Sequence, residues 1–380
     1  MTQGSETRDQ ITYGVRADAT EFPLQIVLSM IYPCNLGCPF CPYTDGNSDI
    51  RKYFHERNAD LFPPALFKKL ADEAAQYKCF LRLTGGGEPT LHPQLVELVE
   101  YAKNKGTGVW LNTNGTCVGP HNPRMQRNLE RLIECGIDMI EFSVDAGDPE
   151  TYAIVRPPRN GKGTPERWHR LVNAIKYALE YRTKIKSPTR IVTSMVMSEY
   201  LRGKADQAVD FWLHEVEVDE VIRRKFLTWD QNTTLDHSHA LDPDLYGHLE
   251  EQGTREACVW PFERFNVDTL GRVQLCGQDI SITTAEMFPN LNDVSIKDVW
   301  QGETFKRYRE FHLKGHGDKL YPCDRCSAWK AGVRDWNHGW LKVLGNAEKH
   351  RQKALHDTSA ADEVGMETEV LRRKTNLEKE

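Results

Sequence analysis

The sequence predicts an α/β fold with a parallel sheet, followed by a smaller region that contains four cysteines. Between residues 23 and 226, short apolar runs alternate with segments of helical periodicity. Strands that alternate with helices pair in parallel through right-handed crossovers. This alternation fits either an open doubly wound sheet or a partial barrel. It stops after residue 226, which indicates a second structural unit.

Each apolar run is typical of a strand buried on both faces, because its apolar residues are nearly continuous. Helices are expected between the runs, and the pair Pro63-Pro64 suits the first turn of the earliest one. The predicted strands are 23–31, 79–84, 108–112, 138–144, 190–197 and 220–226.

A loop with three cysteines follows the first predicted strand. Cys34, Cys38 and Cys41 have the spacing C-x3-C-x2-C. A [4Fe–4S] cluster has four irons and usually takes four cysteines, so three cysteines leave one iron open to a ligand that is not protein. A zinc site would normally bring four ligands with paired C-x2-C spacing. Disulfides within one short loop are not expected in a chain that lacks a secretory signal.

With Phe40 before its last cysteine, this loop resembles the signature of the radical S-adenosylmethionine (SAM) superfamily. The resemblance implies a partial (β/α)6 barrel over residues 23–227, with SAM on the open iron. It also implies an external one-electron reductant such as flavodoxin or ferredoxin. The reduced cluster would convert SAM into a 5′-deoxyadenosyl radical, which removes a hydrogen atom from the substrate.

Polar motifs follow the next predicted strands, and the C-terminal ends of barrel strands are where such enzymes place their chemistry. A run of three glycines lets a backbone approach a ligand closely and adopt positive φ, although an ordinary turn is the alternative. In the family, the matching glycine turn meets the amino group of SAM. Asp145 has a second interpretation as a helix cap. The predicted cofactor-binding residues are Phe40, Gly85, Gly86, Gly87, Glu88, Asn112, Ser143 and Asp145.

A second cysteine group lies in the later part of the chain. Cys258 and Cys276 flank a predicted hairpin with its turn at Gly271, and Cys323 and Cys326 form a C-x2-C pair. Four cysteines suit either tetrahedral zinc or a fully ligated [4Fe–4S] cluster. Because it occurs in the same chain as the first cysteine loop, this group resembles the Twitch domain, a shortened form of the SPASM domain. The resemblance implies a small α+β domain with one auxiliary [4Fe–4S] cluster.

The predicted organisation has five parts. Trp329 and Trp340 belong to an apolar stripe that predicts a helix packed on the barrel. The final segment is charged and poor in aromatic residues, which is typical of a loosely held tail. The parts are a polar N-terminal lead (1–22), the barrel (23–227), a linker (228–257), the SPASM/Twitch-type domain with its packing helix (258–345) and the charged tail (346–380).

Two residues are predicted to act in catalysis. Cys117 follows the third strand, where its thiol would suit a hydrogen-atom donor, with plain packing as the alternative. Arg223 and Arg224 lie on the sixth strand, where alternation turns only one of them inward. We assign the inward role to Arg223, which would hold the SAM carboxylate or a substrate oxygen. The basic loop 156–164 is either a phosphate grip or a flexible charged loop.

Composition excludes several classes of function. The net charge of −6 provides no general basic surface for nucleic acid. No apolar run is long enough to cross a membrane, and residues 1–20 lack the apolar core of a signal peptide. A cytoplasmic location is therefore expected, with neither nucleic acid nor membrane as a partner.

The leading functional hypothesis is radical oxidation or epimerisation of a small polyol, such as a sugar, aminosugar or cyclitol. Barrel and cysteine pattern together resemble 2-deoxy-scyllo-inosamine dehydrogenase and the neomycin-type radical epimerase. An auxiliary cluster would accept the electron of a substrate radical as a ketone forms. The first alternative is a maturase for a ribosomally made peptide, ranked lower because only about twenty polar residues precede the first strand. A non-enzymatic metal-binding protein is the third hypothesis.

Overall fold

The computed structural model describes residues 21–44, 48–77, 79–226, 241, 257–258, 260–326 and 340–344. The predicted charged tail, most of the linker and nearly all of the polar lead lie outside the described residues. Among the residues that are described, none belongs to a helix long and apolar enough to cross a membrane.

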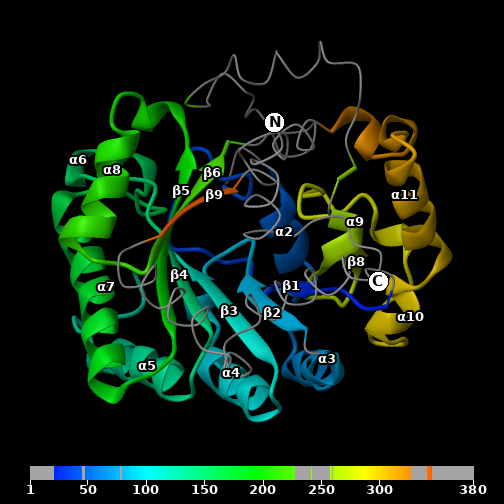
Figure 1. The fold of residues 1–380 in the computed structure, drawn as a ribbon, viewed down its shortest axis with the longest axis horizontal. Helices are drawn as coiled ribbons and strands as arrows, with labels where there is room; N and C mark the ends of the chain where they lie inside the picture. Colours follow the sequence, from blue (N-terminus) through cyan, green and yellow to red (C-terminus); the bar gives the residue numbers. More distant parts are fainter. Residues whose placement is uncertain are drawn as a thin grey trace, which may run out of the picture.

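The fold is built on one curved sheet of nine strands, which runs through the molecule in Figure 1. Its order is β8-β7-β1-β2-β3-β4-β5-β6-β9, and every neighbouring pair from β7 to β6 is parallel. The predicted partial barrel is therefore confirmed. The six barrel strands are β1 (Gln25–Ser29), β2 (Phe80–Thr84), β3 (Gly108–Thr113), β4 (Met139–Ser143), β5 (Arg190–Met197) and β6 (Glu220–Lys225).

Helices cover the outer face of the barrel strands (Figure 1). Four of them have proline in the first turn, where the missing N–H costs no helical hydrogen bond. The helices of the barrel are α2 (Ile50–His55), α3 (Pro64–Gln76), α4 (Leu95–Asn104), α5 (Pro123–Glu134), α6 (Pro149–Val155), α7 (Pro165–Ile185) and α8 (Ala205–Asp210), which continues into the π-helix η4 (Phe211–Glu215).

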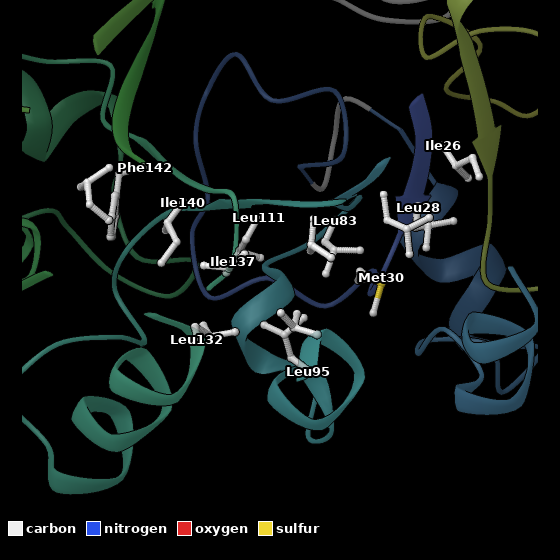
Figure 2. Close-up of a cluster of buried hydrophobic side chains, with 14 of the residues drawn as sticks. Ile26, Leu28, Met30, Leu83, Leu95, Leu111, Leu132, Ile137, Ile140 and Phe142 are labelled. Atoms are coloured by element: carbon white, nitrogen blue, oxygen red, sulfur yellow. The ribbon is translucent and has the colours of Figure 1, made fainter. Parts of the chain in front are cut away.

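The pleat of the strands separates two kinds of side chain. One set, including Leu83, Leu111 and Ile140, packs outward with the helices in the main hydrophobic core (Figure 2). Residues of the opposite parity point into the barrel, because successive strand residues face opposite sides. Inside, a separate apolar cluster that includes Phe80 and Trp110 lies near the N-terminal ends of the strands. Polar side chains follow it toward the C-terminal ends.

The second region continues the barrel sheet. Helix α9 (Trp260–Glu263) leads into β7 (Arg264–Val267), which pairs with β1. Strand β8 (Val273–Gln274) returns antiparallel to β7, which confirms the predicted hairpin. After the hairpin, the chain forms two helices, α10 (Ile296–Trp300) and α11 (Glu303–Leu313), separated at Gln301-Gly302. Phe265 packs against Trp300 and Phe305 of these helices.

The predicted packing helix around Trp329 and Trp340 lies mostly outside the described residues. Its described end is a strand, β9 (Trp340–Leu344), so the helix prediction is wrong for Trp340. Strand β9 pairs antiparallel with β6 and covers the backbone edge that β6 would otherwise expose. The helical spacing of the tryptophans did not reveal that this segment is a strand, because its partner β6 lies more than 100 residues earlier in the chain.

Candidate functional site

A cavity of about 370 Å³ lies at the C-terminal ends of the barrel strands. All three cysteines of the first loop line it, and so do all eight predicted cofactor-binding residues. From the second region, Cys258 and Trp260 also line the cavity. Both cysteine groups therefore contribute to one cavity, which we call the central cavity.

The first cysteine loop is held by the segment that follows α6. Gly37 donates a backbone hydrogen bond to the Pro157 carbonyl (2.9 Å), and Arg159 donates one to the Asn35 carbonyl (2.9 Å). A further β-bridge joins Leu36 to Pro158. The beginning of the basic segment 156–164 thus braces the cysteine loop, a role that neither sequence-based interpretation had included.

The chemistry of this loop fits an iron–sulfur cluster. Burial raises the pKa of Cys38 to about 12, and the charges of Cys34 and Cys41 add to that effect. A buried thiol such as that of Cys38 holds its proton unless positive charge stabilises the thiolate, and iron ions supply such charge when bound. The Arg156 guanidinium acts in the same direction, because its positive charge lowers the pKa of Cys38.

The three glycines after β2 are needed for contact with the cysteine loop. A Cβ on Gly87 would lie 2.0 Å from the Pro33 carbonyl oxygen, and one on Gly85 would lie 2.6 Å from the Ile31 carbonyl oxygen. A Cβ on Gly86 would lie 2.5 Å from the Tyr32 ring. None of the three adopts positive φ. Close backbone packing against protein, in addition to any ligand, therefore explains the glycines.

Glu88 ties the ends of β2 and β3 together. One carboxylate oxygen accepts hydrogen bonds from the Thr90 amide (3.0 Å), the Thr90 hydroxyl (2.6 Å) and the Thr113 hydroxyl (2.6 Å). The other accepts from the Asn114 amide at 2.7 Å. Burial raises the pKa of Glu88, and these four donors oppose that shift. Glu88 thus lines the central cavity as a positioned acceptor with most of its capacity used.

Asp145 joins β4 to β5 and does not cap the following helix. Its carboxylate accepts from the Val196 amide (2.7 Å) and pairs with Arg156. Its φ of 51° is in the left-handed region. The cap of α6 is Asp148, which accepts from the Thr151 amide at 2.8 Å. The helix-cap interpretation of Asp145 is therefore wrong, and the residue holds Arg156 at the cavity.

A buried charge network lies on the barrel side of the cavity. Glu141 pairs with Arg82 (3.2 Å) and with Arg224. Arg82 also donates from Nε to the Asn112 side chain at 2.8 Å. Burial alone would raise the pKa of Glu141, but the two guanidinium groups outweigh it and lower that pKa to about 2. Asn112 thus orients an arginine in addition to lining the cavity.

The structure places Arg223 and Cys117 away from the central cavity. Arg223 points outward and pairs with Asp206 of α8 at 3.3 Å, whereas Arg224 lines the cavity. The inward assignment of Arg223 is corrected, because the parity of β6 turns its neighbour inward. Cys117 lines a separate cavity of about 180 Å³ with residues of α4 and α5. Its sulfur accepts from the Asn35 amide group at 3.5 Å.

The second cysteine group gathers around Cys276. Burial raises the pKa of this thiol well above its usual value, and the charges of Cys326, Cys323 and Cys258 raise it further. Within the described ranges, no three His, Cys, Asp or Glu side chains converge so as to hold one metal ion. By number, the four thiols of this group suit tetrahedral zinc as well as a fully ligated [4Fe–4S] cluster.

Several cavity residues escaped the sequence-based prediction. Some, such as Arg82 and Glu141, lie on strands buried on both faces, where apolar and polar residues do not alternate and the sequence does not reveal which side chains point inward. Others lie outside the strands: Arg51 comes from α2 and donates to the Gly86 carbonyl at 2.9 and 2.8 Å. The missed residues that line the cavity also include Arg156, Arg224, Trp260, Arg264, Asn266 and Gln278.

Comparison with known proteins identifies two domains. The radical SAM superfamily model matches residues 28–193, and the SPASM model, an iron-sulfur cluster-binding domain, matches residues 258–327. The cofactor prediction of SAM and iron–sulfur clusters is confirmed at the level of these domains. That the second group holds one auxiliary cluster, and that it is of the Twitch type, stay predictions.

Two curated relatives are similar over most of the chain. A tungsten-containing aldehyde ferredoxin oxidoreductase cofactor-modifying protein of Pyrococcus furiosus is 28% identical over 80% of this chain and 86% of its own. A PqqA peptide cyclase of Bradyrhizobium diazoefficiens is 24% identical over 82% and 80%, respectively. The crystal structure of Streptococcus suis SuiB shares the fold, with a TM-score of 0.57, 14% identity and coverage of 77% of this chain and 68% of that one.

Proposed function

The chain is a radical SAM enzyme with a SPASM domain, and from this premise we propose that it modifies a ribosomally made peptide. The similarity to the PqqA peptide cyclase carries the proposal, because it spans 82% of this chain and 80% of the relative. The relative is named for a peptide, and we extend that substrate class to this chain.

The predicted small-polyol substrate is wrong. The relatives that match most of this chain are named for a peptide cyclase and for a protein that modifies a cofactor. The error has a physical source, since the cysteine motifs report how a radical is made and not which molecule receives it. Substrate class depends on the cavity wall, which also includes residues outside those motifs, such as Arg51, Arg264 and Asn266.

Within this proposal, the barrel side of the central cavity binds the cofactors. Cys34, Cys38 and Cys41 would hold the cluster, whose SAM ligand supplies the radical precursor when bound. The eight predicted cofactor-binding residues all line the cavity, which supports their assignment to SAM. Cys258, Cys276, Cys323 and Cys326 would hold the auxiliary cluster. We also propose the domain boundaries as predicted, with the barrel at 23–227 and the auxiliary domain at 258–345.

A second candidate is modification of an enzyme's cofactor or cofactor precursor. The observation that favours it is the Pyrococcus furiosus relative. This chain aligns with 86% of that relative's length, and the relative is named for such a role. The cavity is compatible with either substrate, because its wall includes amide, guanidinium and carboxylate groups that can hydrogen-bond to amides as well as to other polar groups. We rank it second because the peptide cyclase matches a similar share of the chain and has a defined substrate in its name.

Anaerobic turnover of the full chain tests the proposed function. The reconstituted protein would be incubated with SAM, dithionite and short peptides encoded beside its gene, and the peptides analysed by mass spectrometry. A peptide changed only when both SAM and dithionite are present supports the proposal. Oxidation or cross-linking removes a pair of hydrogen atoms, whereas epimerisation leaves the mass unchanged, so the product also separates reaction classes.

The control is Cys38→Ser, which removes one ligand of the first cluster. If wild-type protein forms 5′-deoxyadenosine but changes none of the peptides, the peptide hypothesis is rejected. A changed mass in a small cofactor precursor under the same conditions would support the second candidate in its place.

A further inference from the structure

The wall that the second region adds to the central cavity contains two buried side-chain amides with unsatisfied atoms. Asn266 lies on β7 and Gln278 follows β8, with 3% and 8% of their surface exposed. Both line the cavity. Within the described part of the chain, Asn266 Nδ2 and Gln278 Oε1 have no hydrogen-bond partner. Burying such atoms unpaired is unfavourable, so a native site of this kind is suited to a ligand that hydrogen-bonds to them.

These amides belong to a packed site. A Cβ on Gly277 would lie 2.7 Å from the Trp260 ring and 3.5 Å from Asn266 Oδ1, so the glycine allows the indole and the amide to lie close together. The Arg264 guanidinium lies 4.5 Å from the centroid of the Trp260 ring. Because β7 pairs with β1, Asn266 is also in register with Val27, on the strand that leads to the first cysteine loop. The sheet therefore fixes the position of Asn266.

The unsatisfied atoms restrict the kind of ligand. Asn266 Nδ2 is a donor and needs an acceptor, whereas Gln278 Oε1 is an acceptor and needs a donor. Cluster sulfides, thiolates and ionised carboxylates can accept hydrogen bonds but cannot donate them, so none of them satisfies both atoms. A peptide group has both functions on separate atoms, a carbonyl oxygen that accepts and an N–H that donates.

We infer that Asn266 and Gln278 form a subsite for one main-chain peptide group of the substrate. This inference rests on the proposed function and deepens it. The subsite would receive a carbonyl at Asn266 and an N–H at Gln278. Since Cys34 and Cys258 line the same cavity, a peptide held there would lie in the space that both cysteine groups border. Asn266 and Gln278 are thus positioning residues for the substrate main chain.

Crystal soaking with the smallest peptide-group analogue tests the subsite. Crystals of the cluster-reconstituted full chain would be soaked in N-methylacetamide or in methyl acetate, which keeps the carbonyl but lacks the N–H. We expect density for N-methylacetamide within hydrogen-bond distance of both side chains, and none for methyl acetate. Equal density for the two probes would overturn the inference, and so would N-methylacetamide found only elsewhere.

Matched variants sharpen the test. Asn266→Asp keeps the shape and removes the donor, and Gln278→Leu removes the acceptor, so each should abolish binding of N-methylacetamide. Gln301→Leu is the control, because Gln301 is a glutamine of the second region that donates to the Glu21 carbonyl at 3.0 Å and does not line the cavity. Binding that survives in Asn266→Asp, or is lost equally in Gln301→Leu, contradicts the inference.

A modified peptide, once found, separates the two proposals. We expect Asn266→Asp to raise its KM at least tenfold with a smaller change in kcat, and Gln301→Leu to change KM less than twofold. An unchanged KM in Asn266→Asp rejects the subsite and leaves the proposed function intact. If N-methylacetamide binds as expected but no peptide is modified, the proposed function fails while the amide subsite stands.

Discussion

The two walls of the central cavity differ in how their polar groups are satisfied. On the barrel side, Glu141 pairs with two arginines, Asp145 pairs with Arg156, and Glu88 accepts four hydrogen bonds. On the side of the second region, Asn266 and Gln278 retain buried atoms without a partner among the described residues. The carboxylates of the barrel wall are therefore paired within that wall, although Arg156 Nε has no hydrogen-bond partner among the described residues. The two amides of the other wall keep unused hydrogen-bonding atoms, which can serve a ligand.

The cysteine groups differ in a parallel way. Residues 34–41 supply three cysteines from one loop, which the glycine turn and the segment after α6 hold in place. The second group collects four cysteines from three segments, before α9, after β8 and at η9 (Cys323–Arg325). A local group needs only its neighbours to be in place, but a dispersed group needs the whole region to fold. The two groups should consequently fail in different ways.

Removing one cysteine from each group should give the largest contrast. Cys38→Ser should reduce 5′-deoxyadenosine formation to background, because the cluster that activates SAM is lost. Cys276→Ser should keep that activity while losing peptide modification. Iron should fall from about eight to about four per chain in each variant, since each [4Fe–4S] cluster contains four irons. Loss of SAM cleavage in Cys276→Ser would show that the two groups are not independent.

Replacing one glycine near each wall by alanine tests how tightly that wall is packed. Gly87→Ala places Cβ 2.0 Å from the Pro33 carbonyl oxygen, whereas Gly277→Ala meets the Trp260 ring at 2.7 Å. Backbone cannot move aside as a side chain can, so we expect a loss of about 3 kcal/mol or more for Gly87→Ala and about 1 kcal/mol for Gly277→Ala. Chemical denaturation measures both.

The control for this pair is Gly37→Ala, whose Cβ would find its nearest atom at 3.4 Å. It lies on the cysteine loop and should be nearly neutral. If Gly37→Ala destabilised the chain as much as Gly87→Ala, the loop would be sensitive to any added atom and not to the contact with Pro33.

Neighbouring arginines on β6 test whether the barrel wall depends on its charge network. Arg224→Met leaves buried Glu141 with one partner, and removing one partner of a buried pair typically costs about 3 kcal/mol. Arg223→Met removes a pair with Asp206, which is 89% exposed, and should cost about 0.5 kcal/mol. Equal losses of unfolding free energy would contradict the parity of β6 described above.

Acid should weaken the barrel wall through Glu141. Its folded pKa is lowered to about 2, below an unfolded value of about 4.3. A depressed pKa stabilises the fold above the unfolded pKa, and this contribution is lost as pH falls toward the folded pKa. Between pH 5 and pH 3.5 we expect wild-type protein to lose about 1 kcal/mol more than Glu141→Gln. Urea unfolding at the two pH values measures this, and equal losses would contradict it.

Sequence motifs located the cavity because its markers lie at the ends of consecutive strands. The loop at Cys34, the turn at Gly85 and the residues around Ser143 each follow an apolar run, and a parallel sheet brings such positions to one edge. The same reasoning could not choose between Arg223 and Arg224, because Val221 and Ile222 are both apolar and conceal the parity of β6. It also could not show that Cys117 lines a different cavity.

Local chemistry explains what the sequence by itself determined. The barrel strands, the three-cysteine loop and the glycine turn each depend on residues close together in the chain, and these motifs identified the radical SAM and SPASM domains. The tertiary structure alone decided which partners meet across long separations. It paired β7 with β1 and β9 with β6. It thereby placed Asn266 beside Val27, on the strand that leads to the first cysteine loop. Such pairings depend on sheet register, which only the assembled fold specifies.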